Sequence, residues 1–307
     1  MSRPTVGRAP VSRAPVSPAA RAPNGGTLYI VATPIGNLGD VTLRALEVLR
    51  TVPLVACEDT RMTRRLLDRH GIAARLVSYH ARSGPGRLAE LLEHLRAGDD
   101  LALATDAGTP GVSDPGEELV TAWAGEGGRV VPIPGASAVL AAVAATGLAG
   151  PRWAFEGFLP RTGRERRDRL ARIAADDRAA VLFEAPGRVA ATLADLAAAC
   201  GPERPGAVCR ELTKLHETIE RGSLAELAAA AADGRIPARG EFALVVGGWA
   251  GARPPASVEA AADTLRAARA EVERLVTDGL GRVDAARRVA AATGLPRRRL
   301  YGTPRPK

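Results

Sequence analysis

Residues 27–57 read TLYIVATPIGNLGDVTLRALEVLRTVPLVAC, and this stretch decides the fold. Its first part, TLYIVAT, has the continuous apolar character of a buried strand, which Pro34 and Gly36 close. The segment 40–52 then places apolar residues at helical spacing, with Asp40 as a candidate N-cap. PLVAC is a second short apolar strand. Strand, helix and strand in immediate succession predict a parallel sheet covered by helices.

The same alternation continues along the chain and restarts once, after Gly150. We therefore expect an α/β fold with two α/β domains, 27–150 and 151–248. The further strands expected in the first domain are 75–80, 100–106 and 129–134, with helices at 61–71, 87–98, 117–124 and 136–146. The second domain is expected to contain strands at 152–158, 179–184, 206–210 and 240–247, with helices at 163–175, 187–200 and 223–233, and a further segment at 215–221.

The two ends of the chain differ from its middle in composition. Residues 1–26 are rich in Pro, Ala and Arg without apolar periodicity, which predicts a disordered basic tail. A Gly/Pro-rich linker, 249–257, precedes a small helical C-terminal tail, 258–307, whose end has the layout of a helix-turn-helix. Of the net charge of +8, residues 1–26 carry +4 and residues 281–307 carry +7. Basic ends suit a polyanionic partner, although charged, solvated tails are an equal alternative at the N-terminus.

Composition also argues against several classes of protein. Cys57, Cys200 and Cys209 are far apart and form no CxxC pair, which speaks against a disulfide framework or a zinc site and fits a reducing cytosol. With only four histidines in the chain, no metal is expected. The uncharged stretch 130–151 is interrupted by Pro and Gly, and no secretory signal is visible. We expect a cytoplasmic protein with no membrane segment.

Four loops follow strands of the first domain and combine small residues with polar ones. They are Thr33–Asn37, Glu58–Arg61, Asp106–Gly111 and Pro134–Ser137. Each loop taken alone is an ordinary turn. Their occurrence at successive strand ends predicts a nucleoside-type ligand, because parallel α/β sheets bind ligands at the carboxyl ends of their strands. Neither GxGxxG nor GxxxxGK[ST] is present, so a Rossmann dinucleotide site or a P-loop has no support.

The segments LYIVATPIGN, LVACEDTR, ALATDAGTPGVSDPG and VVPIPGASA, with FEGFLPR, FEAPGRV and CRELTKLHETIERG further on, carry a resemblance. The chain resembles the tetrapyrrole methylase-like methyltransferases over about 27–248, and more narrowly their ribosomal RNA branch. The resemblance implies that S-adenosyl-L-methionine binds in a cleft between the two domains. It also implies 2′-O-methylation of a cytidine in the decoding region of small-subunit (16S) rRNA, within the small ribosomal subunit, by a homodimer.

The resemblance implies which residues contact the cofactor. They are Pro34, Gly36, Asn37, Asp106, Ala107, Gly108, Thr109, Pro134, Gly135, Ala136 and Ser137, together with backbone atoms of Leu212. Asp106 is the best candidate for a hydrogen bond to the cofactor, and the alternative is that it caps a turn. One departure stands at Gly187, where the family often has a His, so whatever that His does is not carried over.

Methyl transfer to a ribose hydroxyl needs a base, because the 2′-hydroxyl is a poor nucleophile. Glu58 and Asp59 are the candidate catalytic carboxylates, since two carboxylates in a cleft can push one pKa toward neutrality. The alternative is a structural ion pair with Arg61 or Arg64. The sulfonium of the donor supplies the electrophile, so the reaction requires no metal.

Several basic residues are candidates for contacts with RNA phosphates, because the guanidinium fork matches phosphate. They are Arg61, Arg161, Arg164, Arg166, Arg167, Arg188, Lys214, Arg297, Arg298 and Arg299. The alternatives are a solvated helix face for 164–169 and a surface ion pair of Lys214 with Glu211 or Glu217. Lys214 is one of only two lysines in the chain.

Two other functions are compatible with parts of the sequence. A methylase of a small macrocycle would share the fold and cofactor, but the TPIGN and EDTR loops and the basic tail speak against it. A non-catalytic RNA-binding assembly factor would use the basic ends alone, and the full set of strand-end loops speaks against that.

Overall fold

The computed structural model describes residues 25–248, 258–293, 295 and 297–300. All but the last two residues of the expected N-terminal tail lie outside the described residues, as do the expected linker and residues 301–307. The chain divides into two compact units, Met1–Ser137 and Ala138–Lys307. In the described part of the chain, no helix has the length and apolar character needed to cross a membrane.

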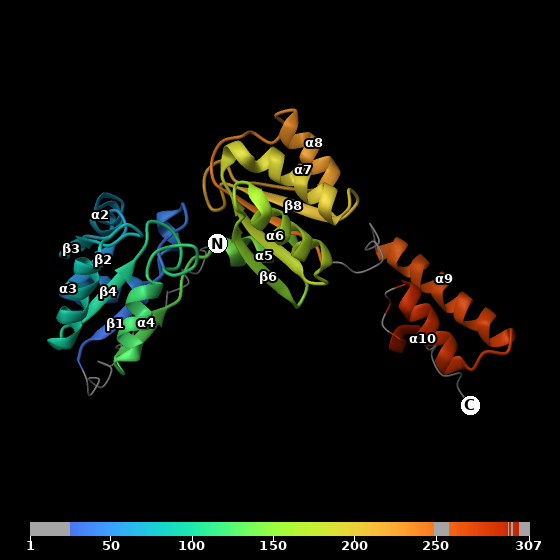
Figure 1. The fold of residues 1–307 in the computed structure, drawn as a ribbon, viewed down its shortest axis with the longest axis horizontal. Coiled ribbons are helices and arrows are strands. Elements are labelled where there is room, and N and C mark those ends of the chain that lie inside the picture. Colours follow the sequence, from blue (N-terminus) through green and yellow to red (C-terminus); the bar gives the residue numbers. More distant parts are fainter. Residues whose placement is uncertain (1–24, 249–257, 294, 296, 301–307) are drawn as a thin grey trace, which may run out of the picture. The chain divides into compact units, whose positions relative to one another are not determined.

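The first unit is built on a five-stranded sheet in the order β3-β2-β4-β1-β5 (Figure 1). Its strands are β1 (Thr27–Val31), β2 (Leu54–Cys57), β3 (Leu76–Ser78), β4 (Leu101–Ala104) and β5 (Arg129–Ile133). Every pairing is parallel, with Leu28 of β1 opposite both Leu101 of β4 and Val130 of β5. The parallel sheet predicted from residues 27–57 is therefore confirmed.

Helices cover both faces of this sheet. Side chains along a strand point alternately to the two faces, and each face forms an apolar cluster with its own helices. Ala102 and Ala104 join the cluster that contains α1 (Leu43–Thr51) and α2 (Thr60–Arg69). Leu101 and Leu103 join the cluster that contains α3 (Pro85–Arg96) and α4 (Glu117–Gly125), centred on the buried Trp123.

The start of α1 differs from the prediction. Its N-cap is Thr42, whose Oγ1 accepts a hydrogen bond from the Ala45 N–H at 3.1 Å. Asp40 instead ends a short 3-10 turn, η1 (Leu38–Asp40), which is capped by Asn37. A threonine hydroxyl caps a helix as a carboxylate does. The cap lies two residues later than predicted because the turn η1 comes between the strand and the helix.

The second unit has a mixed sheet in the order β6-β7-β10-β8-β9. Its strands are β6 (Trp153–Phe158), β7 (Ala179–Glu184), β8 (Pro205–Arg210), β9 (Thr218–Ser223) and β10 (Phe242–Val246). Among the neighbouring strands, only the pair β6 and β7 is parallel. Strand β10 runs antiparallel to both of its neighbours, β7 and β8. The restarted strand–helix pattern had suggested another mostly parallel sheet. The loop between β8 and β9 contains no crossover helix, so this pair is antiparallel.

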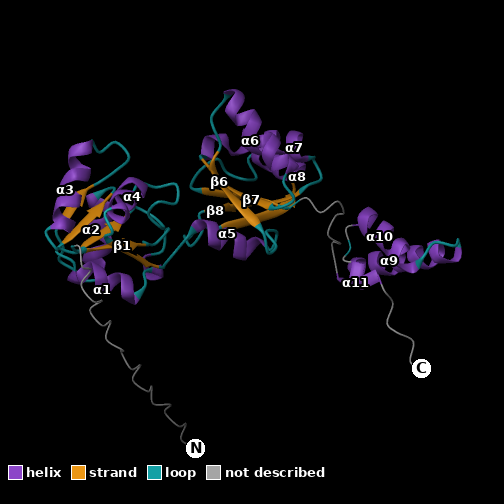
Figure 2. Ribbon diagram, turned by 60° about the horizontal axis from the view of Figure 1, so that its bottom comes forward, coloured by secondary structure: helices purple, strands orange, loops and turns teal. Residues whose placement is uncertain are grey.

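Three helices, α6 (Gly163–Ala175), α7 (Val189–Cys200) and α8 (Leu224–Ala232), pack on one face of the second sheet around Leu182, Leu193 and Leu244. Between β7 and α7 lies a short 3-10 turn, η2 (Pro186–Arg188). Helix α5 (Ala138–Thr146) contacts β7, β9 and β10 and lies on the opposite side from α6 and α7 (Figure 2). These contacts assign α5 to the second unit, whereas the boundary expected at 150 had left it with the first domain.

The C-terminal tail is helical, as predicted. Helices α9 (Val258–Thr277), α10 (Arg282–Thr293) and α11 (Arg297–Leu300) enclose a small apolar cluster of Ala268, Val272, Ala285, Ala286, Val289 and Leu300. Gly294 and Pro296, within the expected turn, lie outside the described residues, so the helix-turn-helix stays a prediction.

Candidate functional site

The candidate loops of the first unit begin side by side. Strands β2, β4, β1 and β5 are consecutive neighbours in a parallel sheet, so the residues after them share one edge. The loops after β1 and β4 are joined directly: the Thr33 N–H donates to Gly108 O at 2.8 Å, and the Gly108 N–H donates to Thr33 O at 3.1 Å. The Thr33 hydroxyl also donates to Thr105 O at 3.0 Å. The loops that contain the TPIGN and DAGTP motifs are therefore joined by hydrogen bonds and hold each other in place.

Small residues allow close backbone approach in these loops. Gly108 has a φ of 86°, which L side chains rarely adopt, so its place in the bridge to Thr33 favours glycine. A Cβ on Gly135 would lie 2.9 Å from the Cβ of Ala32, so the loop after β5 packs closely on the end of β1. Ser113 adopts a φ of 65° without being glycine, and such strain is concentrated at functional sites.

The other cofactor candidates surround this bridge at different depths. Pro34 is buried, whereas Gly36 and Asn37 are exposed, and the Asn37 side chain accepts a hydrogen bond from the Gly39 N–H at 3.0 Å. Ala107, Thr109, Ala136 and Ser137 are half-buried, and Pro134 and Gly135 are exposed. The loops thus present accessible backbone and small side chains at one sheet edge.

Asp59 is fixed by a structural role. It is the N-cap of α2, and its Oδ1 accepts from the Arg61 N–H at 2.8 Å. The Arg61 guanidinium pairs with the same carboxylate at 2.6 Å. Hydrogen bonds from the Arg61 side chain and backbone hold the pKa of Asp59 at about 2, so this carboxylate is a weak base. The alternative of an ion pair with Arg61 is therefore present in the structure.

Glu58, Asp106 and Asp114 form a cluster of half-buried carboxyl groups that interact electrostatically. Burial, followed by the charge of Asp106, raises the pKa of Glu58. Burial also raises the pKa of Asp106, whose Oδ1 accepts from the Asp59 N–H at 2.9 Å. Burial and the charges of Glu58 and Asp106 raise the pKa of Asp114 to about 6. Three carboxyl groups with raised pKa values therefore lie together at the sheet edge, a pattern that is common at functional sites.

This edge has the groups that a nucleoside-type cofactor needs. Asp106 offers carboxylate oxygens for hydroxyl or amine donors, close to the glycine backbone at Gly108. Thr105 Oγ1 is buried with no hydrogen-bond partner among the described residues, immediately before Asp106. No group of three or more His, Cys, Asp or Glu side chains in the described part of the chain has the arrangement of a metal site. The residues present fit an organic cofactor held by hydrogen bonds.

In the second unit, Leu212 lies buried between two strained residues. Glu211 and Thr213 have φ values of 53° and 66°, and a β-branched residue in this region is a genuine outlier. Lys214 Nζ contacts Glu211 Oε1 and Glu241 Oε2, each at 3.0 Å. The Glu241 N–H also donates to Glu211 Oε1 at 2.9 Å. These contacts hold the loop around Leu212 in its strained conformation.

Two of the arginines considered as phosphate ligands have intramolecular partners instead. Arg188 Nη2 donates to Leu159 O at 2.8 Å, and its Nε lies 3.3 Å from the buried carboxylate of Glu184. Arg166 is only 8% exposed, donates to Pro160 O at 3.0 Å and pairs with Asp195 at 2.7 Å. These contacts fix the turn that follows β6.

The remaining basic candidates whose side chains the structure describes are exposed, except Lys214, which is held in its two ion pairs. Arg61 is 88% exposed despite its ion pair, and Arg161 is exposed with no side-chain partner found among the described residues. Arg297 and Arg299 are exposed on α11, and the side chain of Arg298 lies outside the described residues. Direct phosphate contact by these residues stays a prediction.

Sequence reasoning missed two features of the site. Asp114 lies in the quoted DAGTPGVSDPG segment, but nothing in its residue type indicated a carboxyl group brought beside Glu58 and Asp106. The strained backbone at Glu211 and Thr213 gave no signal either, because neither residue favours positive φ. Only the fold brings these features together.

Comparison with known proteins shows to which family the chain belongs. Residues 27–228 match the family model described as Tetrapyrrole (Corrin/Porphyrin) Methylases. A protein of Synechocystis sp. named Ribosomal RNA small subunit methyltransferase I is 48% identical over 276 residues, 90% of this chain and 96% of its own length. A protein of the same name from Xylella fastidiosa is 43% identical over 277 residues, with 90% and 98% coverage.

Solved structures show the same fold at lower identity. Diphthine synthase superposes with a TM-score of 0.57 and 16% identity, covering 73% of this chain and 90% of the other. The uroporphyrin-III C-methyl transferase from Thermus thermophilus, complexed with S-adenyl homocysteine, superposes with a TM-score of 0.53 and 22% identity, covering 72% and 97%. With its parallel first sheet, its joined strand-end loops and these similarities, the chain is a methyltransferase that belongs to the tetrapyrrole (corrin/porphyrin) methylase family.

Proposed function

We propose that this protein methylates small-subunit ribosomal RNA, and more specifically the ribose 2′-hydroxyl of a cytidine in the decoding region. The observation that carries the proposal is the similarity, over nine-tenths of the chain, to proteins named Ribosomal RNA small subunit methyltransferase I. The exposed arginines at Arg61 and Arg161 and the basic C-terminal end support a polyanionic substrate.

S-adenosylmethionine is the methyl donor, and when bound it supplies an electrophilic methyl group on a sulfonium. In our proposal Asp106 accepts hydrogen bonds from the cofactor, and the Thr33–Gly108 bridge keeps the loops that surround it in place. The strained segment around Leu212 contributes backbone contacts from the second unit.

Between the two candidate bases, the geometry favours Glu58. Asp59 already caps α2 and pairs with Arg61, which holds its pKa at about 2. Glu58 is half-buried beside Asp106, which raises its pKa and makes its carboxylate the stronger proton acceptor. Glu58 would take the proton of the 2′-hydroxyl as the oxygen accepts the methyl group, with S-adenosylhomocysteine as the leaving group.

The test is a transfer assay with S-adenosylmethionine carrying a labelled methyl group. Small ribosomal subunits, free 16S rRNA, a tetrapyrrole and buffer are offered in parallel. Label in the rRNA, mapped to a site where alkaline cleavage is blocked, is the expected result, because a 2′-O-methyl group removes the hydroxyl that cleavage needs. Label in the tetrapyrrole alone would favour the macrocycle methylase. Cofactor binding without transfer to any of these acceptors contradicts the proposal.

A further inference from the structure

Phe158, the last residue of β6, has a solvent-exposed aromatic side chain. Aromatic residues make up only 3% of the chain. Among those whose burial the structure describes, Phe158 alone is exposed, at 53% of its surface. Leu159, the next residue, is 2% exposed, so the chain turns inward immediately after the ring. The ring at the end of β6 is therefore accessible to a ligand.

A β-bulge directs this ring to its position. In the register of β6 and β7, Phe155 lies opposite Val181, Gly157 opposite Leu182 and Phe158 opposite Phe183, so Glu156 is an extra residue. Without the bulge, Phe158 would be the third residue after Phe155 in a regular strand and would lie on the opposite face, toward the core formed with α6 and α7. With it, both rings contact Phe183, at centroid distances of 5.0 Å for Phe155 and 5.7 Å for Phe158.

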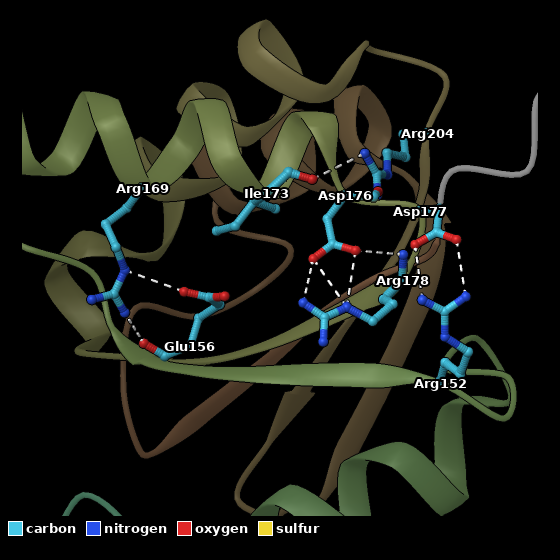
Figure 3. A network of polar contacts seen from close by, with 8 residues as sticks. All are labelled: Arg152, Glu156, Arg169, Ile173, Asp176, Asp177, Arg178 and Arg204. Atoms are coloured by element: carbon cyan, nitrogen blue, oxygen red, sulfur yellow. Dashed lines mark hydrogen bonds and ion pairs between the residues drawn. The ribbon is translucent and has the colours of Figure 1, made fainter.

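The bulge and the turn after it are fixed by three arginines. From α6, Arg169 reaches Glu156 twice: it donates a hydrogen bond to the backbone carbonyl and forms a 3.2 Å ion pair with the carboxylate (Figure 3). In the turn, Arg188 donates to Leu159 O and Arg166 donates to Pro160 O. The ring is therefore presented on a rigid support, which lowers the entropic cost of binding.

The segment that follows the ring in the chain is rich in arginine. Residues 161–169 contain five arginines and two acids, a net charge of +3. Arg166 and Arg169 face inward in the contacts above, while Arg161, Arg164 and Arg167 are exposed. Arg164 forms only a 3.5 Å ion pair with the exposed Asp168. A flat ring three residues before the exposed guanidinium of Arg161 is complementary to a nucleotide, which has a flat base and an anionic phosphate.

We infer that Phe158 is a stacking platform for an unpaired base of the RNA substrate, with Arg161 holding an adjoining phosphate. This inference rests on the proposed function and adds the surface that receives single-stranded RNA. A contact with a second copy of the chain is the competing use of the ring, and the oligomeric state of the variants tests it. Stacking tolerates any base, so the platform contributes affinity rather than sequence selection.

The experiment compares Phe158→Ala, Phe158→Leu and Phe158→Trp with the parent protein. The probe is a short single-stranded RNA of mixed sequence that contains 5-iodocytidine, followed by fluorescence anisotropy and by photo-crosslinking. The Ala and Leu variants are expected to bind about fivefold to a hundredfold more weakly, and the Trp variant to bind as tightly as the parent. Leu43→Ala is the matched control, because Leu43 is 82% exposed and lies on α1 of the other unit.

Crosslinking to Phe158 in the parent, with S-adenosylmethionine affinity and oligomeric state unchanged in every variant, completes the expected result. Unweakened RNA binding by the Ala variant overturns the inference, as does full affinity of the Leu variant, since leucine keeps the packing on Phe183 but cannot stack. A change of oligomeric state would make the ring a subunit contact. Methylation of small ribosomal subunits is measured in parallel: if the parent methylates no RNA, the proposed function fails, whereas an unaltered KM in the Ala variant refutes only the platform.

Discussion

At the residue scale, neighbouring acids of the EDTR loop have different roles because their surroundings differ. Asp59 receives hydrogen bonds from Arg61, whereas Glu58 is half-buried beside Asp106. Sequence alone left the two carboxylates equivalent, since both follow the same strand and have an arginine nearby. The assignment needs the direction of each side chain, which depends on the start of α2.

Glu58→Gln should lower kcat by about a hundredfold or more, because a positioned base commonly contributes that much. Asp59→Asn should change kcat far less, since asparagine also caps helices. Both variants should keep their affinity for S-adenosylmethionine, as expected when only transition-state interactions are removed. Steady-state kinetics with small ribosomal subunits measure the difference. An equal fall of kcat in the two variants would contradict the assignment of Glu58 as the base.

Asp114→Asn should stabilise the protein above neutral pH but not in acid. Burial and the charges of Glu58 and Asp106 raise the folded-state pKa of Asp114 from 3.8 to about 6. Between these pH values the folded protein keeps a proton that the unfolded chain has released, so the free energy of unfolding falls as pH rises through this range. The Asn variant does not undergo this fall and should be more stable by about 1 kcal/mol at pH 8, after allowance for solvent screening. Urea denaturation at pH 4 and pH 8 tests the sign, and a gain at pH 4 alone would refute it.

Asp106→Ala and Gly108→Val should abolish S-adenosylmethionine binding without unfolding the chain. The first removes a carboxylate that accepts from the Asp59 N–H, and the second places a β-branched residue at a φ of 86° in the bridge to Thr33. Titration calorimetry measures the affinity, with circular dichroism as the control for folding. Gly71→Ala, at a positive φ in another loop with free space around it, shows what backbone strain alone does. Unchanged affinity in the Asp106 variant would remove this loop from the cofactor site.

At the element scale, the helices and strands could be predicted well, because apolar runs and Gly or Pro stops mark each of them. Strand direction in the second sheet could not, since residues 206–247 show the same apolar runs for parallel and antiparallel neighbours. The bulge at Glu156 was equally hidden, because it depends on the pairing of β6 with β7 and on Arg169 from α6. Features made by two elements together leave no local pattern in either.

The end of α6 depends on a single buried side chain. Arg204 is 4% exposed, and its guanidinium donates to the carbonyls of Ile173, Ala174, Asp176 and Gly247 (Figure 3 shows the first of these contacts). Arg204→Leu should lower the free energy of unfolding by about 3 kcal/mol, because buried carbonyls are left without donors. Arg178→Ala, which removes an exposed pair with Asp176, is the control and should have little effect. Denaturant titration compares the two, and similar stabilities would show that the carbonyls find water instead.

At the scale of the whole molecule, the net positive charge lies at the two ends of the chain and not in the part that contains the strand-end loops. Residues 27–280 have a net charge of −3, so attraction to RNA must come from local patches and from the basic ends. This separation was visible in the sequence, because net charge requires no fold. Which arginines are available was not: Arg166 and Arg188 stabilise a turn, whereas Arg161 is exposed.

The helical tail should therefore contribute to RNA affinity through its exposed arginines and not through the cofactor loops. Truncation after residue 280 would expose Ala268 and Val272, whose cluster includes α10, so substitutions are the cleaner test. Replacing Arg297 and Arg299 with Gln leaves that cluster intact, because both side chains are exposed. If each arginine neutralises one phosphate of a single strand, the slope of log affinity against log salt should flatten by about 0.7 for each arginine replaced. S-adenosylmethionine affinity should stay the same, since the substituted side chains belong to neither set of cofactor loops.

Arg287→Gln is the matched control, because Arg287 is exposed but pairs with Asp284 at 3.0 Å and should release fewer counterions. An unaltered salt slope in the Arg297/Arg299 variant, with methylation at the normal rate, would mean that these arginines are solvated and that RNA is held by the two α/β units alone.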